Sequence, residues 1–191
     1  PAAPTPNISV RWRPFIIGYR DITDTGESQR FVTGIQGQAG GWDYDANFLH
    51  SASKVSETLN GGYFRIYGNN ATNPLTGAGG DASGPGIIAL INSGRINPFG
   101  ENAADVVADA RATNFIGEAF QSKTSLTGLQ GKVSREFGAL DGGPMGVALG
   151  AETRRESFKL NSSPALASGD ISGYGGNFVP ISISRTVVGA F

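Results

Sequence analysis

The chain has 191 residues, and its 15 basic and 16 acidic side chains leave a formal charge of −1, which gives no electrostatic footprint for nucleic acid or for an anionic lipid surface. Cysteine is absent, which excludes disulfides, thiolate metal sites and cysteine nucleophiles. Only 16% of the residues are charged, against roughly 25% in an average soluble domain, and 29 are glycine. No run approaches the ~18 apolar residues of a membrane-spanning helix, so any membrane crossing has to use strands.

The first predicted element is a strand from Arg20 to Gln38 in which Phe31, Thr33 and Ile35 share one face. Gly40 and Gly41 follow, and their tolerance of positive φ predicts a tight turn. A second strand then runs from Trp42 to Glu57 and alternates strictly in polarity. One face carries Trp42, Tyr44, Ala46 and Phe48, and the other carries Asp43, Asp45 and Asn47. The two runs predict an antiparallel hairpin.

A segment from Thr58 to Asn114 is rich in glycine, asparagine and proline and is predicted to be one long loop. Apolar spacing indicates two short helices within it, from Gly86 to Ser93 and from Asn102 to Arg111. Compact soluble domains rarely contain such a long connection unless it has a function. The loop is therefore the first place to look for ligand recognition.

A second hairpin is predicted between Gln121–Phe137 and Met145–Phe158, with Gly142 and Gly143 supplying the positive φ of its turn. Its second strand places Met145, Val147, Leu149 and Ala151 on one face. A glycine- and serine-rich loop, Asn161 to Phe178, leads to a fifth strand from Ile181 to Phe191. The chain starts at Pro1 without a signal peptide and stops within this strand, so both ends are expected to be cuts through a larger protein.

Short turns alternate with long loops, and the strands are longer than the 5 to 6 residues typical of soluble sheets. This pattern is typical of antiparallel transmembrane β-barrel hairpins with short periplasmic turns and long extracellular loops. The predicted fold class is therefore all-β, with residues 1–191 forming part of a barrel and residues 58–114 its long extracellular loop. We expect six apolar side chains to be exposed on the lipid-facing side: Trp42, Tyr44, Phe48, Met145, Val147 and Leu149. A soluble β-sandwich would instead bury them beneath a second sheet.

Two hairpins carry a family resemblance. The residues from Gln29 to Gly37 with those from Gly41 to Ala46, and the run from Leu140 to Glu156, are similar to barrel hairpins of TonB-dependent receptors of Gram-negative bacteria. The segment from Ile96 to Gly100 resembles an element of their extracellular loops. Resemblance covers about Arg20 to Phe191, and the order and spacing of these segments carry it.

The resemblance implies a roughly 22-stranded barrel in the cell outer membrane, closed by an internal plug domain. Such a receptor takes up iron chelates, vitamins or carbohydrates, with energy from an inner-membrane complex. The plug domain, the segment that contacts the TonB complex and the remaining strands are absent from this sequence. Implied partners are outer-membrane lipid, the transported ligand and, through the missing parts, the plug and the TonB complex. The alternative is a secreted all-β adhesin or structural binding domain.

Catalytic patterns are weak, and we expect no enzyme, no cofactor and no metal site. The triplet Asp24-Thr25-Gly26 matches an aspartic protease motif, but it occurs once and is better explained as a polar bend. His50 is the sole histidine, so a Ser-His-Asp triad would have to include it, and the sequence contains no nucleophile-elbow motif. In the long loop, Tyr63, Arg65 and Tyr67 are the candidate ligand contacts, since tyrosine and arginine are frequent anchors of recognition surfaces. Arg65→Ala is expected to weaken ligand uptake and to leave barrel assembly intact.

Overall fold

The computed structural model describes residues 12–69, 80, 82–174, 176 and 178–191. In chain order the elements are η1 (Phe15–Ile17), β1 (Asp21–Ala39), β2 (Trp42–Gly61), α1 (Ile87–Asn92), α2 (Ala104–Ala112), β3 (Gly117–Leu140), β4 (Gly143–Ser162), α3 (Pro164–Ala167) and β5 (Ile181–Ala190). The contacts between these elements divide the chain into two compact units. The sheet unit comprises residues 24–57, 118–163 and 179–191, and the loop unit comprises the described residues of 1–23, 58–117 and 164–178.

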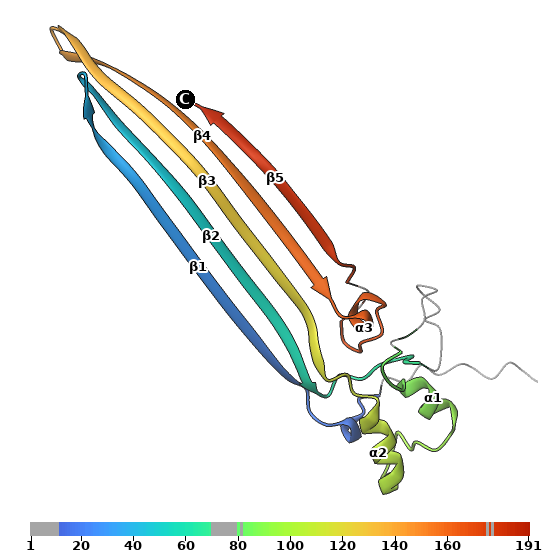
Figure 1. The fold of residues 1–191 in the computed structure, drawn as a ribbon. Helices are drawn as coiled ribbons and strands as arrows, with labels where there is room; N and C mark the ends of the chain where they lie inside the picture. Colours follow the sequence, from blue (N-terminus) through green and yellow to red (C-terminus); the bar gives the residue numbers. More distant parts are fainter. Residues whose placement is uncertain (1–11, 70–79, 81, 175, 177) are drawn as a thin grey trace, which may run out of the picture. The chain divides into compact units, whose positions relative to one another are not determined.

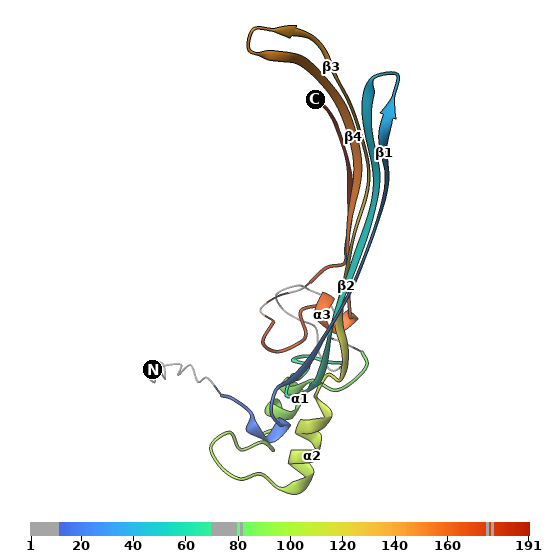
Figure 2. The same ribbon diagram turned by 90° about the vertical axis from the view of Figure 1, so that its left-hand side faces the viewer.

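The five strands form one sheet in the order β1-β2-β3-β4-β5, so each strand is hydrogen-bonded to its neighbour in the sequence (Figure 1). The pairs β3–β4 and β4–β5 are antiparallel. Figure 2 shows these strands as a single layer. The predicted all-β class and both predicted hairpins are confirmed. Within the described residues the sheet stays open, with β1 and β5 as its edges, so a closed barrel stays a prediction.

The first hairpin turns as its sequence predicts. Gly40 has a φ of 60° and Gly41 a φ of 80°, and β2 begins at the next residue. Positive φ at both central residues is the signature of a type I′ turn, whose twist matches that of the flanking strands. The two glycines therefore fix where β1 ends and β2 begins.

The second hairpin differs in one detail. Leu140 pairs with Gly143, which leaves Asp141 and Gly142 as a two-residue connection. Gly143 has a positive φ of 131°, but Gly142 does not, so the predicted role of Gly142 is wrong. The second positive φ, 61°, falls at Gly138, where the register shifts between Phe137 and Ala139. This is a β-bulge, whose extra residue locally increases the twist of β3.

The strands also extend further than the alternating pattern predicts. Polar alternation fades after Glu57 and before Gln121, yet β2 continues to Gly61 and β3 begins at Gly117. Cross-strand hydrogen bonds sustain these extensions where the sequence has no apolar period. One contact of this kind joins the side-chain amide of Asn60 to the Thr23 hydroxyl at 2.9 Å, across β2 and β1.

The loop unit has a hydrophobic core of its own. Both predicted helices are confirmed as α1 and α2, and their apolar faces pack with η1. The buried residues of this core are Ile17, Ile87, Leu90, Ile96, Val106 and Ala110. The long loop is therefore largely a folded unit in its described part, although residues 70–79 and 81 lie outside that part. None of the described helices has the length and apolar character needed to cross a bilayer.

Candidate functional site

One face of the sheet unit is apolar near the two hairpin turns. In the β3–β4 register, Phe137 pairs with Met145 and Val133 with Leu149. Directly paired residues of an antiparallel sheet project to the same face, so these four side chains are neighbours there. Arg135, which pairs with Val147, places its guanidinium carbon 5.9 Å from the ring centre of Trp42. The contact brings β2 onto the same face.

The same face continues over both outer strands. The rings of Phe31 and Phe48 lie 6.4 Å apart, and a Cβ added at Gly37 would meet the Tyr44 ring. On the other side, Thr153 pairs with Val188. We call this surface the apolar band. Its members are Phe31, Ile35, Trp42, Tyr44, Phe48, Leu129, Val133, Phe137, Met145, Val147, Leu149 and Val188.

None of the six side chains predicted to face lipid is buried. Leu149 is 57% exposed, and Tyr44, Met145 and Val147 are also exposed. Trp42 and Phe48 are half-buried because Arg135 and Phe31 rest against their rings. Their common face and their lack of a covering layer are confirmed, since the described residues contain one sheet only. The band is thus an exposed apolar surface, interrupted by the Arg135 side chain, and a large exposed apolar surface on a folded protein marks an interaction site.

The opposite face of the same strands is mostly polar at the height of the band, where it carries Asp43, Lys132 and Glu152, with Val32 as an exposed apolar exception. The Gln38 side-chain amide donates to Asp43 at 3.2 Å, across the first hairpin. Further along, the Glu156 carboxylate accepts a hydrogen bond from Arg185. Period-two alternation places these charges on the side away from the band. The sheet therefore presents one apolar and one water-compatible surface at the same height.

The polarity of the two faces is reversed toward the ends of the strands that lead into the long connections. There Phe158 pairs with Ile183 on the face opposite the band, and Lys123 pairs with Lys159 on the face of the band. The apolar band therefore ends on β4 near Thr153, and cations follow it on the same face.

The candidate ligand residues lie in the loop unit, and the structure buries two of them. Tyr63 is 8% exposed, with its ring centre 5.7 Å from that of Tyr174 and 4.9 Å from the Arg20 guanidinium carbon. Tyr174 in turn meets Phe178 edge-on at 6.1 Å. Tyr63 is thus part of an aromatic cluster with an arginine over its ring. Ligand contact by Tyr63 stays a prediction.

Arg65 is 7% exposed, and its side chain contacts other residues of the loop unit. Its guanidinium donates to the Asn114 carbonyl at 2.7 Å and to the Ser83 hydroxyl at 2.8 Å, and it lies 5.3 Å from the Phe115 ring centre. Truncation would remove all three contacts, so Arg65→Ala cannot report on ligand binding alone. Tyr67 is half-buried and is the better probe of the predicted contact.

Sequence reasoning missed Asp170, which is fully buried beside these residues. One carboxylate oxygen accepts from the Tyr67 backbone N–H at 2.6 Å, and the other accepts from the Gly68 N–H at 2.9 Å. Around it, Arg65 forms an isolated antiparallel bridge with Ile171. Asp170 thus joins the segment after β2 to the segment after α3. No local pattern could reveal this, because about a hundred residues separate the partners.

Asp24 and His50, the residues of the two weak catalytic patterns, do not form a catalytic site together. Asp24 is exposed on β1, and His50 uses its Nδ1 in a 2.9 Å hydrogen bond with the Thr127 hydroxyl on β3. This bond joins two strands at the border of the apolar band. Among the residues that the structure describes, no group of three histidine or carboxylate side chains is arranged to hold a metal ion.

Comparison of this chain with protein-family models, with curated proteins and with solved structures finds no match. The similarity of the two hairpins to TonB-dependent receptors therefore stays a prediction from the sequence.

Proposed function

We propose that this chain forms part of the wall of an outer-membrane β-barrel of the TonB-dependent receptor type and contributes extracellular segments for uptake of a small ligand. The exposed apolar band is the observation that carries the proposal. Removing exposed apolar surface from water is favourable by about 25 cal/mol per Å², so a single-layer sheet with this surface needs an apolar phase against it. Bilayer hydrocarbon is such a phase.

The dimensions of the band support a bilayer. It extends along β4 from Met145 to Thr153, eight steps of about 3.3 Å that make roughly 26 Å of strand. A strand tilted by about 45° crosses the hydrocarbon in 9 to 11 residues, within an apolar band about 25 Å tall. The polar face with Asp43 and Glu152 then lines a water-filled lumen. The open edges of β1 and β5 are satisfied by further strands of the barrel.

Ligand uptake follows from the connections of the strands. Both two-residue turns lie at the end of the sheet where the band begins, whereas the other strand ends continue into residues 62–116 and 163–180. Long connections on one side are the extracellular loops of such barrels. Loops held by a rigid scaffold carry recognition. An iron chelate, a vitamin or a carbohydrate is the class of ligand that the resemblance implies.

Single-cysteine variants on neighbouring positions of β4 test the proposal, and this chain contributes no cysteine of its own. Leu149→Cys places the thiol on the apolar band, and Ala148→Cys places it on the opposite face. In outer membranes from cells that make the full protein, we expect the thiol of Leu149→Cys to resist a water-soluble maleimide. A fluorophore at the same thiol should be quenched by spin-labelled lipid, while the thiol of Ala148→Cys reacts readily and its fluorophore is not quenched.

The control is a second pair on another strand, Val133→Cys on the band and Lys132→Cys opposite. Alternation in both pairs supports a lipid-facing band. Equal reaction of all four thiols with the aqueous reagent, or recovery of the protein as a soluble folded monomer, would contradict the proposal and favour a secreted adhesin or structural domain.

A further inference from the structure

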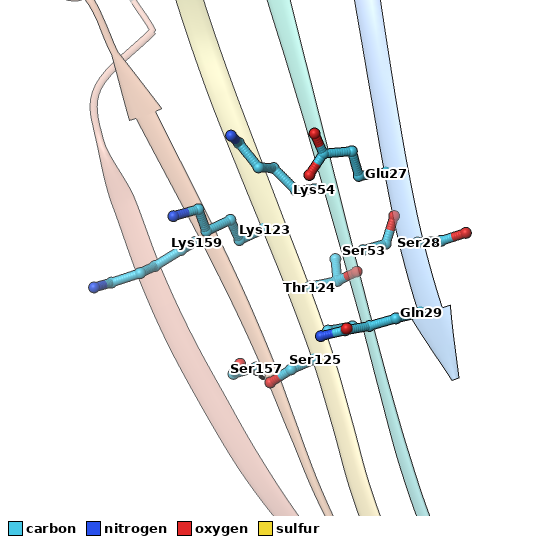
Figure 3. Close-up of a pocket in the computed structure, with 11 residues that line it drawn as sticks. Glu27, Ser28, Gln29, Ser53, Lys54, Lys123, Thr124, Ser125, Ser157 and Lys159 are labelled. Atoms are coloured by element: carbon cyan, nitrogen blue, oxygen red, sulfur yellow. Dashed lines mark hydrogen bonds between the residues drawn. The ribbon is translucent and has the colours of Figure 1, made fainter. Parts of the chain in front are cut away.

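Beyond the apolar band, the same face of the sheet carries three lysines on adjacent strands. Lys123 on β3 pairs directly with Lys159 on β4, and Lys54 on β2 lines the same shallow hollow (Figure 3). Lys159 and Leu149 are an even number of residues apart on one strand, so they share a face. The hollow, about 580 Å³ in volume, contains these three ammonium groups and one carboxylate, that of Glu27. We call the three lysines the lysine cluster.

Within the described residues the lysine cluster carries three positive charges against the single carboxylate of Glu27, and no ion pair neutralises them. Lys54, Lys123 and Lys159 form no ion pair with any described residue, whereas the nearby Glu156 pairs with Arg154 and Arg185 on the other face. Like charges placed directly opposite each other in a sheet destabilise it, and Lys123 and Lys159 are such a pair. A bound anion would remove this repulsion.

Hydroxyl groups and a fourth cation extend the cluster toward the band. The Ser125 and Ser157 hydroxyls are 2.7 Å apart between the two strands, and Arg155 follows on the same face, exposed and paired with Thr127. From Arg155 to Lys159 the cations span about 13 Å of strand. A single phosphate cannot reach both ends. A headgroup with several anionic groups can contact all four cations.

We propose that the lysine cluster with Arg155 binds the phosphorylated saccharide headgroup of an outer-leaflet lipid, whose acyl chains lie against the apolar band. This inference rests on the proposed function, because the band has to face lipid for the headgroup to reach the cluster. Strong, charge-assisted hydrogen bonds from ammonium, guanidinium and hydroxyl groups suit phosphate oxygens. Basic pockets beside membrane-spanning segments recognise anionic headgroups in this way.

The test uses the full protein, purified in detergent and titrated with lipopolysaccharide, with bound lipid measured by native mass spectrometry. Lys123→Gln is compared with Lys132→Gln, a lysine on the same strand but on the opposite face. We expect about fivefold weaker binding for Lys123→Gln, since a cation near an anionic lipid surface is worth about 1 kcal/mol. Lys132→Gln should bind normally, and the triple Lys54, Lys123 and Lys159→Gln variant should lose most binding.

Two further arms identify the ligand. Enzymatically dephosphorylated lipopolysaccharide should bind the unsubstituted protein as weakly as intact lipopolysaccharide binds the triple variant. Inorganic phosphate at millimolar concentration should not displace the intact lipid from the unsubstituted protein. Unchanged binding of the triple variant, equal binding of the dephosphorylated lipid, or displacement by phosphate alone would overturn the inference. The quenching assay with Leu149→Cys on the same preparations separates the two proposals. If the fluorophore at Leu149→Cys is quenched but the triple variant binds lipid normally, only the headgroup site is wrong. If the fluorophore is not quenched, the proposed membrane location of the band is wrong as well.

Discussion

At the scale of single residues, Asp170 shows how one side chain organises the loop unit. Its carboxylate accepts two backbone N–H groups, those of Tyr67 and Gly68, and its own backbone N–H donates to Ala165 at 2.8 Å. Its carbonyl accepts from the Ile66 N–H, also at 2.8 Å. These hydrogen bonds at one buried residue tie separate segments together. The candidate ligand residues Arg65 and Tyr67 therefore depend on Asp170 for their positions.

We predict that Asp170→Asn destabilises the loop unit by about 2–4 kcal/mol. An amide keeps the shape but accepts at one oxygen only, so one buried N–H is left facing an NH2 group, and each unsatisfied buried group costs about 1–3 kcal/mol. Limited proteolysis and hydrogen exchange of residues 58–69 would measure the change. The control is Asp141→Asn, at an exposed turn position where asparagine is favoured. Equal protection in both variants would contradict the prediction.

At the scale of elements, the first hairpin depends more on its turn than on the strand propensity of the residues in β1. The strand β1 includes Gly26, Gly34 and Gly37, which weaken a strand interior, yet it extends over 19 residues. Its register is fixed by Gly40 and Gly41 and by cross-strand contacts such as that of Phe31 with Phe48. A slip of one residue would move Phe31 and Ile35, the band residues of β1, to the polar face.

We predict that Gly41→Ala destabilises the hairpin by about 1–2 kcal/mol, because an alanine at a φ of 80° incurs the left-handed penalty. The matched control is Gly131→Ala on β3, where an added Cβ meets no atom and φ is not positive. That change should be neutral or slightly stabilising. Urea unfolding of the protein in lipid vesicles gives both values. An effect at Gly41 no larger than that at Gly131 would contradict the prediction.

At the scale of the whole molecule, the asymmetry between the two faces of the sheet is the property that function would use. Neighbouring residues on β4 face different surroundings: Val147 and Leu149 belong to the apolar band, and Ala148 belongs to the polar face. A charge introduced on one face should therefore cost much more than the same charge on the other. The difference measures the medium that each face contacts.

From the proposed lipid-facing orientation of the band, we predict that Leu149→Lys destabilises the protein in a bilayer by about 2–4 kcal/mol, the cost of a cation near the middle of a lipid-facing strand. Ala148→Lys, on the face that the proposal assigns to the lumen, should change the free energy of unfolding by less than about 1 kcal/mol. Heat-modifiable migration in gels reports assembly, and urea unfolding from vesicles reports stability. Similar costs for the two lysines would indicate that both faces contact water.

The sequence by itself determined the hairpins and the apolar band, because both follow from local rules. Period-two alternation assigns Trp42, Tyr44, Met145 and Leu149 to one face, and paired glycines mark the first turn. The bulge at Gly138 escaped this reasoning, since Gly138, Gly142 and Gly143 are equally able to take a positive φ and only the cross-strand register selects among them.

Only the tertiary structure decided how the loop unit is built and where the cations gather. Residues 58–114 look like a loop because their core residues are few and scattered, and Ile17 and Ala110 meet only when distant segments pack. Arg65 was chosen by residue type, but its burial follows from partners such as Ser83 and Asn114. Lys54, Lys123 and Lys159 lie far apart in the chain and form a cluster only through strand register. Local periodicity fixes which face a side chain occupies, and long-range pairing fixes its neighbours.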